Sequence, residues 1–147
     1  MTIECGVLQI ETNCASEMLA HVQEALPNEG VGLLAGPKAG QVTMVVPLHS
    51  SGGPKHFFVE PYVQYLGEKK IKDRNLQLLA IYHSHPGGCA NLSDLDLCFA
   101  KNWDCLQVVI ANAGLEGHPV GIRVFRVFSG MAIPIEFQVI PNLRLRN

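Results

Sequence analysis

Apolar residues along the chain follow a strand-like alternation in some stretches and a helix-like spacing in others. Residues 3–10 alternate between apolar and polar side chains, which indicates a strand. From Asn13, the expected N-cap, apolar residues recur at helical spacing until Pro27 ends the run. Short runs rich in apolar residues predict further strands at 31–36, 41–48, 56–59, 78–82, 106–111, 120–128 and 133–140.

Two more helices complete the predicted set. Pro61 suits the first turn of a helix that runs to about residue 75, and a shorter helix is expected from Ser93 to about Lys101. Strands that alternate with helices early in the chain and cluster late in it favour an α/β fold, a mixed β-sheet flanked by helices. The sequence has no repeat and no long linker, so we expect residues 1–147 to form a single domain.

Composition and charge narrow the class of protein. Of the 147 residues, 48% are apolar and 16% are charged, which indicates a compact fold rather than a disordered chain. The net charge of −2 argues against a protein built mainly to bind nucleic acid. The sequence lacks both the roughly 18 to 20 consecutive apolar residues of a membrane span and the pattern of a signal peptide. We therefore expect a cytoplasmic protein without a membrane segment, whose five cysteines are free thiols.

The end of the predicted strand 78–82 carries the most chemical information. It runs directly into His83-Ser84-His85-Pro86, followed by two glycines. Because side chains alternate along a strand, His83 and His85 point to one face, and Ser84 points to the other, where we expect it to pack or hydrogen-bond. Pro86 ends the strand, and the glycines let the chain turn back sharply.

After this turn, Ser93 reads as the N-cap of the next helix and Asp96 falls at its third position. Either piece alone has an ordinary interpretation: His-x-His as two hydrogen-bonded strand residues, and Ser-x-x-Asp as a helix-capping box. Together, two imidazoles and one carboxylate match the ligands of zinc and leave its fourth position open for water, as in catalytic zinc sites. The combination therefore indicates a catalytic metal site at His83, His85 and Asp96.

These residues resemble the signature of the JAMM (MPN-plus) metallopeptidase family. That signature is a distant Glu, then His-x-His-Pro, six residues, and Ser-x-x-Asp. The chain matches its spacing with residues 83–86, 87–92 and 93–96, and residues 27–36 match the stretch around the Glu, Pro-x-Glu-x-x-Gly-x-Leu-x-Gly. The resemblance implies an MPN domain, a cytidine-deaminase-like α-β-α sandwich.

The resemblance also implies a role for each site residue. His83, His85 and Asp96 would bind one Zn²⁺ ion with a catalytic water as the fourth ligand. Glu29 would act as the general base on that water, and Ser93 would help to hold the tetrahedral oxyanion. The choice of Glu29 rests on the resemblance, because the residues alone do not separate it from other glutamates in the chain.

The resemblance points to a zinc metallopeptidase or isopeptidase that cleaves after the C-terminal diglycine of a ubiquitin-like or sulfur-carrier protein. The alternative is a catalytically silent MPN-type scaffold, as in members that have lost the ligands. A zinc nucleobase deaminase needs His-x-Glu and Pro-Cys-x-x-Cys, and the commoner metalloprotease helix needs His-Glu-x-x-His. The sequence contains none of these motifs. It does not indicate the oligomeric state.

Four residues near the motifs keep open interpretations. Cys89 is either a small residue in a tight loop or a thiolate able to occupy the open zinc position. His49 stands where the family often carries Asn. Trp103 is expected to be a core anchor, and Asp104 is a candidate acceptor for the second ring N–H of a ligand histidine.

Overall fold

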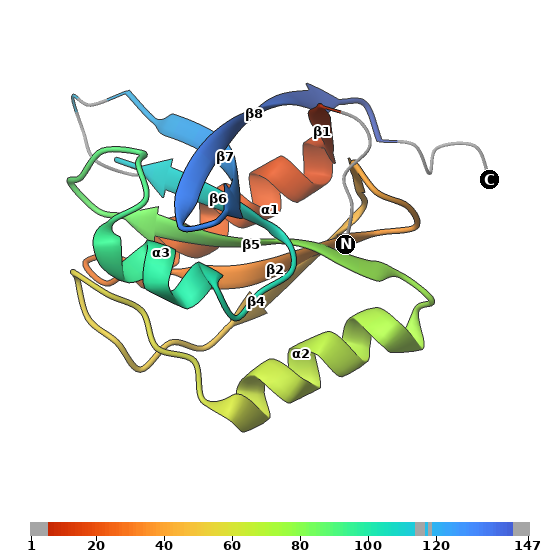
Figure 1. The fold of residues 1–147 in the computed structure, drawn as a ribbon, viewed down its shortest axis with the longest axis horizontal. Helices are drawn as coiled ribbons and strands as arrows, with labels where there is room; N and C mark the ends of the chain where they lie inside the picture. The colour runs from red at the N-terminus through yellow and green to blue at the C-terminus, as the bar shows by residue number, and fades with distance from the viewer. Residues whose placement is uncertain (1–5, 114–116, 118, 143–147) are drawn as a thin grey trace.

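The computed structural model describes residues 6–113, 117 and 119–142. Eight strands and three helices follow one another along this part of the chain (Figure 1): β1 (Val7–Glu11), α1 (Thr12–Ala25), β2 (Val31–Gly36), β3 (Gln41–Val42), β4 (Met44–Leu48), α2 (Pro61–Asp73), β5 (Gln77–His85), α3 (Asp94–Ala100), β6 (Leu106–Ala111), β7 (Gly121–Phe128) and β8 (Met131–Ile140).

All eight strands form one mixed sheet, in the order β3-β1-β8-β7-β6-β5-β2-β4. The pairs β1–β3, β1–β8 and β5–β6 are parallel, and the remaining pairs are antiparallel. Only Thr43 separates β3 from β4, although these strands lie at opposite ends of the strand order. The two ends of the sheet therefore meet at this residue, and the sheet is strongly curved.

Helices cover both faces of the sheet, as the sequence predicts. On one face, Met18 and Val22 of α1 pack into a core with Tyr82 and other inward side chains of the strands. On the other face, Ile71 of α2 packs against Ile81 and its neighbours in β2 and β4. Alternation along β5 places Tyr82 on the α1 side and Ile81 on the α2 side, so both faces of β5 are buried. The strand that ends in the two histidines is thus held rigidly.

The predicted strand at 56–59 is wrong. These residues lie in a loop between β4 and α2 whose backbone groups find partners within the loop instead of the sheet. The N–H of Phe58 donates to Ser50 Oγ at 3.0 Å, and the Phe58 carbonyl accepts the N–H of Ser51 at 2.9 Å. A short apolar run can satisfy its backbone in this way without joining a sheet.

Two other boundaries differ from the prediction. Helix α1 starts at Thr12, directly after β1, and the N–H of Asn13 donates to Asn142 Oδ1 at 3.0 Å, so Asn13 is not the N-cap. The single strand expected at 41–48 is two strands, β3 and β4, on different partners. Of the strand expected at 3–10, residues 3–5 lie outside the described residues.

Within the described part of the chain, no helix is long and apolar enough to cross a membrane.

Candidate metal centre

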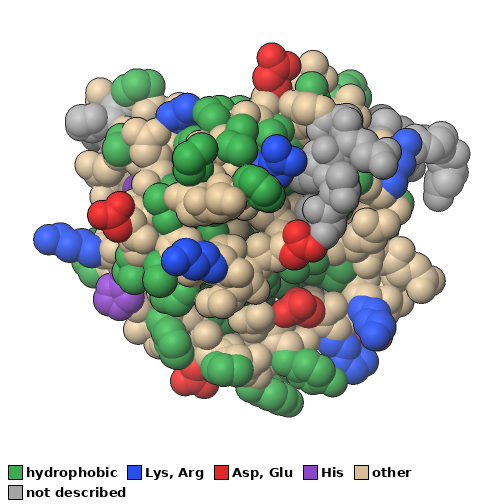
Figure 2. Space-filling view, in the orientation of Figure 1, with side chains coloured by type: hydrophobic (Ala, Val, Ile, Leu, Met, Phe, Trp, Pro, Cys, Tyr) green, Lys and Arg blue, Asp and Glu red, His purple; other side chains and the backbone are tan. Residues whose placement is uncertain are grey.

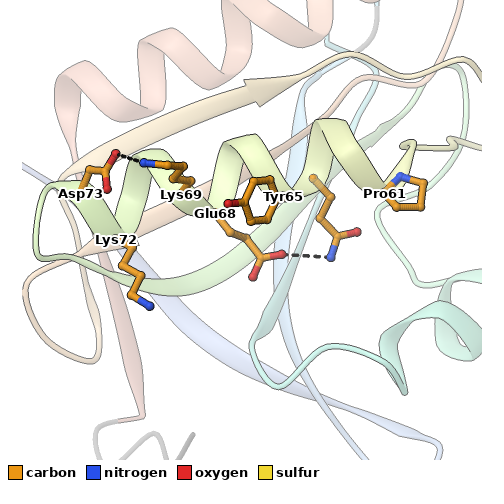
Figure 3. Close-up of a pocket in the computed structure, with 7 residues that line it drawn as sticks. Pro61, Tyr65, Glu68, Lys69, Lys72 and Asp73 are labelled. Atoms are coloured by element: carbon orange, nitrogen blue, oxygen red, sulfur yellow. Dashed lines mark hydrogen bonds and ion pairs between the residues drawn. The ribbon is translucent and has the colours of Figure 1, made fainter.

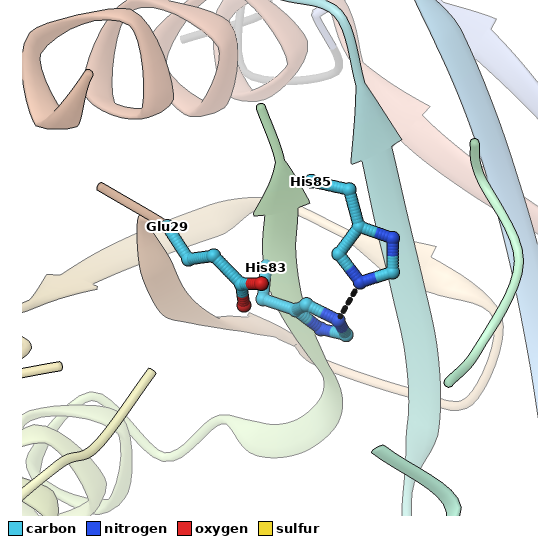
Figure 4. A group of neighbouring side chains, drawn as sticks. All are labelled: Glu29, His83 and His85. Atoms are coloured by element: carbon cyan, nitrogen blue, oxygen red, sulfur yellow. Dashed lines mark hydrogen bonds between the residues drawn. The ribbon is translucent and has the colours of Figure 1, made fainter. Parts of the chain in front are cut away.

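The end of β5 places two imidazole rings side by side, as the alternation along the strand predicts. His83 Nε2 and His85 Nε2 are 3.0 Å apart (Figure 4). The His83 side chain is 1% exposed and the His85 side chain 14% exposed, so water reaches the site from the His85 side. Ser84 lies between them with its hydroxyl on the opposite side of the strand, where it accepts the N–H of Gly30 at 2.8 Å. The expected structural hydrogen bond of Ser84 is confirmed.

The first turn of α3 brings a carboxylate to these rings. Ser93 and Asp96 form a reciprocal capping box: Ser93 Oγ accepts the Asp96 N–H at 3.1 Å, and Asp96 Oδ2 accepts the Ser93 N–H at 2.9 Å. The same Asp96 oxygen lies 3.2 Å from His83 Nε2 and 3.0 Å from His85 Nε2. One geometry thus caps the helix and aims a carboxylate oxygen at both histidines.

The three atoms form a triangle that fits a tetrahedral metal. Its sides, between the two ring nitrogens and Asp96 Oδ2, are 3.0, 3.0 and 3.2 Å long. Around tetrahedral zinc, ligand atoms at about 2.0–2.1 Å from the ion lie roughly 3.3–3.4 Å apart. Small outward shifts would therefore suffice to hold the ion, and a fourth position would remain open.

Glu29 reaches the same place from the chain just before β2. Figure 4 shows its carboxylate pointing toward His83, and one ligand-type atom from each of Glu29, His83 and His85 lies within 4.8 Å of the others. Glu29 is only 5% exposed, and its Oε1 has no hydrogen-bond partner among the described residues. A buried acceptor without a donor, beside a set of metal ligands, fits a group that bonds a metal-bound water.

Burial and mutual contact perturb the pKa values of the four groups. Burial raises the pKa of Glu29 to about 7; His85 opposes this increase, and Asp96 adds to it. Burial also lowers the pKa of His83. For Asp96, hydrogen bonds from His83 and His85 outweigh burial and hold the pKa well below its usual range. For His85, burial lowers the pKa, but Asp96 and the Cys89 carbonyl outweigh it and raise the value to about 8.

A carbonyl of the intervening loop orients His85. Its Nδ1 lies 2.8 Å from the Cys89 carbonyl oxygen, which leaves Nε2 facing Asp96 and His83. Such a partner for the second ring nitrogen sets the tautomer and orientation of a ligand histidine. The sequence makes Asp104 a candidate for the acceptor of a ligand histidine's second ring N–H; at His85 the Cys89 carbonyl lies in that position instead. His83 Nδ1, by contrast, is buried and has no hydrogen-bond partner among the described residues.

An aromatic side chain that the sequence did not single out lies against the metal ligands. The ring of Phe57 lies 5.0 Å from that of His83 and 5.7 Å from that of Phe99, centroid to centroid. Phe57 belongs to the segment 56–59, whose apolar run predicts a strand of the sheet and gives no sign that the segment lies beside the metal ligands. Phe99 is exposed, as are Phe58, next to Phe57 in the sequence, and Leu95, next to Asp96. An apolar surface therefore borders the site.

Among the cavities of the described residues, two lie along helices α1 and α2, outside the ligand set. One of about 440 Å³ is lined by residues of α1, by Glu29 and its neighbours before β2, and by the end of β4 with the following residues, His49 among them. Another, of about 470 Å³, follows α2 (Figure 3), where Lys69 pairs with Asp73 at 2.9 Å. In the space-filling view, apolar side chains line this lower edge of the molecule, with Lys or Arg side chains at its right end (Figure 2).

Comparison with known proteins agrees with this geometry. Residues 11–127 match the family described as prokaryotic homologs of the JAB domain. The chain is 35% identical over 127 residues to a probable TtuB-protein conjugate cleaving protease of Thermus thermophilus, covering 80% of this chain and 83% of the relative. It is 25% identical over 126 residues to the CysO-cysteine peptidase of Mycobacterium bovis, covering 84% and 85%.

Solved structures show the same fold. A protein from Desulfitobacterium hafniense, known from a solution structure, is 28% identical and covers 94% of this chain and 95% of its own, with a TM-score of 0.82. The structure described as "JAMM: A Metalloprotease-like Zinc Site in the Proteasome and Signalosome" is 16% identical and covers 90% and 98%, with a TM-score of 0.54. The fold is that of an MPN domain. The chain belongs to the family of prokaryotic homologs of the JAB domain, the compact prokaryotic branch of the JAMM/MPN proteins.

Proposed function

We propose that this protein is a zinc-dependent metallopeptidase or isopeptidase that cleaves after the C-terminal diglycine of a ubiquitin-like or sulfur-carrier protein. The observation that carries the proposal is the convergence of His83 Nε2, His85 Nε2 and Asp96 Oδ2 within 3.2 Å of one another, with the buried Glu29 beside them. A set of three ligands, with a carboxylate beside it whose Oε1 has no hydrogen-bond partner among the described residues, matches catalytic rather than structural zinc sites.

His83, His85 and Asp96 would hold the ion. Bound zinc supplies a Lewis acid and lowers the pKa of a coordinated water to about 7. Glu29, buried beside these residues with its Oε1 unpaired among the described residues, would take a proton from that water and later give it to the leaving amine. Its burial keeps the carboxylate out of bulk water, and the neighbouring ligands fix the direction in which it can accept a proton.

Ser93 is suited to bind the oxyanion that forms when the carbonyl is attacked. Its Oγ accepts the Asp96 N–H at 3.1 Å, which uses a lone pair and leaves the hydroxyl hydrogen available to donate. The capping box holds this hydroxyl one turn from the ligand carboxylate. A donor placed in advance at a developing negative charge stabilises the transition state more than the substrate.

The proposed substrate class rests on the relatives. One is named for cleaving TtuB-protein conjugates and another as a CysO-cysteine peptidase. Three exposed apolar residues, Phe99 against the Phe57 ring, Phe58 next to Phe57 in the sequence and Leu95 next to Asp96, offer a surface for a protein tail that leads to the scissile bond. We place the reaction in the cytoplasm, in keeping with the absence of a disulfide among the four described cysteines.

The test uses zinc-loaded protein and a ubiquitin-like carrier that bears an extension beyond its diglycine. We expect mass spectrometry to show release of the carrier ending in Gly-Gly, with no release by the Glu29→Gln variant. A matched carrier with Ala-Ala in place of Gly-Gly checks selectivity for the tail. A protein that binds zinc at one ion per chain and cleaves no carrier conjugate would support the silent scaffold instead.

A further inference from the structure

The base lies on a short piece of chain that leaves the sheet just before β2. Strand β2 pairs with β5 in antiparallel register, with Val31 opposite His83. The next pair along the ladder is Gly30 with Ser84. Glu29 is the residue just before Gly30 in the chain. The position of its carboxylate therefore depends on how Gly30 is held against β5, the strand that carries both histidines.

Two hydrogen bonds join Gly30 to Ser84, and they are of different kinds. The Ser84 N–H donates to the Gly30 carbonyl at 3.0 Å, as in an ordinary ladder. The Gly30 N–H instead donates to the Ser84 side-chain oxygen at 2.8 Å. A side chain thus takes the place that a main-chain carbonyl occupies in a regular antiparallel pair. The regular ladder ends here, and Glu29 turns away from the sheet toward the metal ligands.

Contacts with α1 and with the loop after β4 also restrain Glu29 and Gly30. A Cβ on Gly30 would come within 3.1 Å of Val22 Cγ1 and 3.3 Å of Ala25 Cβ, so α1 presses directly on the Gly30 backbone. On the far side, the N–H of Glu29 donates to the Gly53 carbonyl at 3.1 Å. Ser84, only 3% exposed, is the one of these partners that lies on the strand between the two histidines.

We propose that Ser84 is a positioning residue for Glu29: its hydroxyl, by accepting the Gly30 N–H, sets the carboxylate relative to His83 and His85. Its side chain points to the opposite face from the histidines, so it touches neither the metal nor the substrate. This inference rests on the proposed function, because it names Ser84 as the residue that positions Glu29, the general base of that reaction. A displacement of about 1 Å in a reacting group costs roughly 100-fold in rate.

The experiment compares wild type with Ser84→Ala, Ser84→Cys and Ser84→Thr on a cleavable diglycine conjugate. Cysteine keeps the size of serine but is a weak acceptor, and threonine keeps the hydroxyl. We expect kcat to fall about 10- to 100-fold in Ser84→Ala, less in Ser84→Cys, and least in Ser84→Thr. KM, and zinc affinity measured by chelator competition, should stay within about threefold of wild type, because the metal ligands and the exposed apolar residues Phe58, Leu95 and Phe99 are unchanged.

Thr12→Ala is the matched control, because it removes a side-chain hydrogen bond to a main-chain carbonyl, that of Ile140, far along the sequence from the site. It should leave kcat unchanged. If Ser84→Ala does not fold, the Cys and Thr variants still order kcat by acceptor strength. Wild-type kcat in Ser84→Ala or Ser84→Cys, or a loss of zinc affinity equal to the loss of kcat, overturns the inference alone. A zinc-loaded wild type that cleaves no conjugate overturns the proposed function and the inference with it.

Discussion

Residues 83–96, the ligand segment, and residues 28–31, the base segment, deliver their side chains to one point by different routes. His85 and Asp96 are 11 positions apart, and their meeting depends on one strand end, one turn and one capped helix start. Gly30 and Ser84 are 54 positions apart, and Glu29 depends on strand pairing, on α1 and on the loop after β4.

The difference separates two properties of the site. Changes within the ligand segment should remove the metal, since they act on the ligands themselves. Changes that reach only the base segment should leave the metal and weaken proton transfer. Zinc content and cleavage rate, measured on the same variants, therefore tell which segment a substitution has disturbed.

Replacing Asp96 tests the ligand segment with the largest expected effect. Asp96→Ala removes a ligand oxygen and one half of the capping box. We expect zinc affinity to fall at least about 100-fold, cleavage to be lost, and the free energy of unfolding without metal to drop by about 1 kcal/mol. Asp94→Ala, on the same helical turn but outside the box, is the control and should bind zinc normally. Stoichiometric zinc in Asp96→Ala would remove Asp96 from the ligand set.

The pH dependence of zinc binding is the next largest effect. Asp96 and the Cys89 carbonyl outweigh burial and raise the pKa of His85 to about 8 in the metal-free protein. Zinc must displace the His85 proton below this pH, so affinity should rise about tenfold per pH unit from 6 to 8 and level off above 8. Chelator competition at constant ionic strength measures it. An affinity independent of pH between 6 and 8 would show that His85 is already neutral there.

Replacing Phe57 tests the residues around the metal ligands, with a smaller expected change in zinc affinity. Its ring contacts His83, so Phe57→Ala should weaken zinc binding by about 0.5–1.5 kcal/mol, or up to about tenfold. The neighbouring exposed Phe58 is the control for the same chemical change. Phe58→Ala should leave zinc affinity unchanged and raise KM for a carrier conjugate. If Phe57→Ala and Phe58→Ala change zinc affinity equally, the contact between Phe57 and His83 does not stabilise the bound metal.

Cys89 should give the smallest change. The thiol is exposed, and its Sγ accepts a hydrogen bond from Asn91 Nδ2 at 3.6 Å. We expect Cys89→Ala to alter kcat/KM by less than about threefold, as surface substitutions usually do. The measurement is cleavage under reducing conditions and after mild oxidation. A rise of tenfold or more in Cys89→Ala would instead identify the thiol as an inhibitor of the site.

The same contrast explains what the sequence could predict. His83 and His85 follow from the two-residue period of a strand, and Asp96 from a capping box, because these are local rules. Glu29 needed the family resemblance, since its place depends on the pairing of β2 with β5 and on Gly53 in a loop without periodicity. Phe57 was missed for that reason, and the strand expected around it does not form. The meeting of β3 and β4 at Thr43 is likewise a property of the whole curved sheet, which no local pattern reveals.

The most direct test of the account compares zinc content and cleavage in Glu29→Gln, a change that keeps the size of the side chain and removes its charge. We predict one zinc ion per chain with wild-type affinity and a kcat about 100- to 10,000-fold lower on a diglycine conjugate. Loss of zinc from Glu29→Gln would make Glu29 a ligand, and wild-type cleavage would exclude it as the base; either result contradicts the division between ligand segment and base segment.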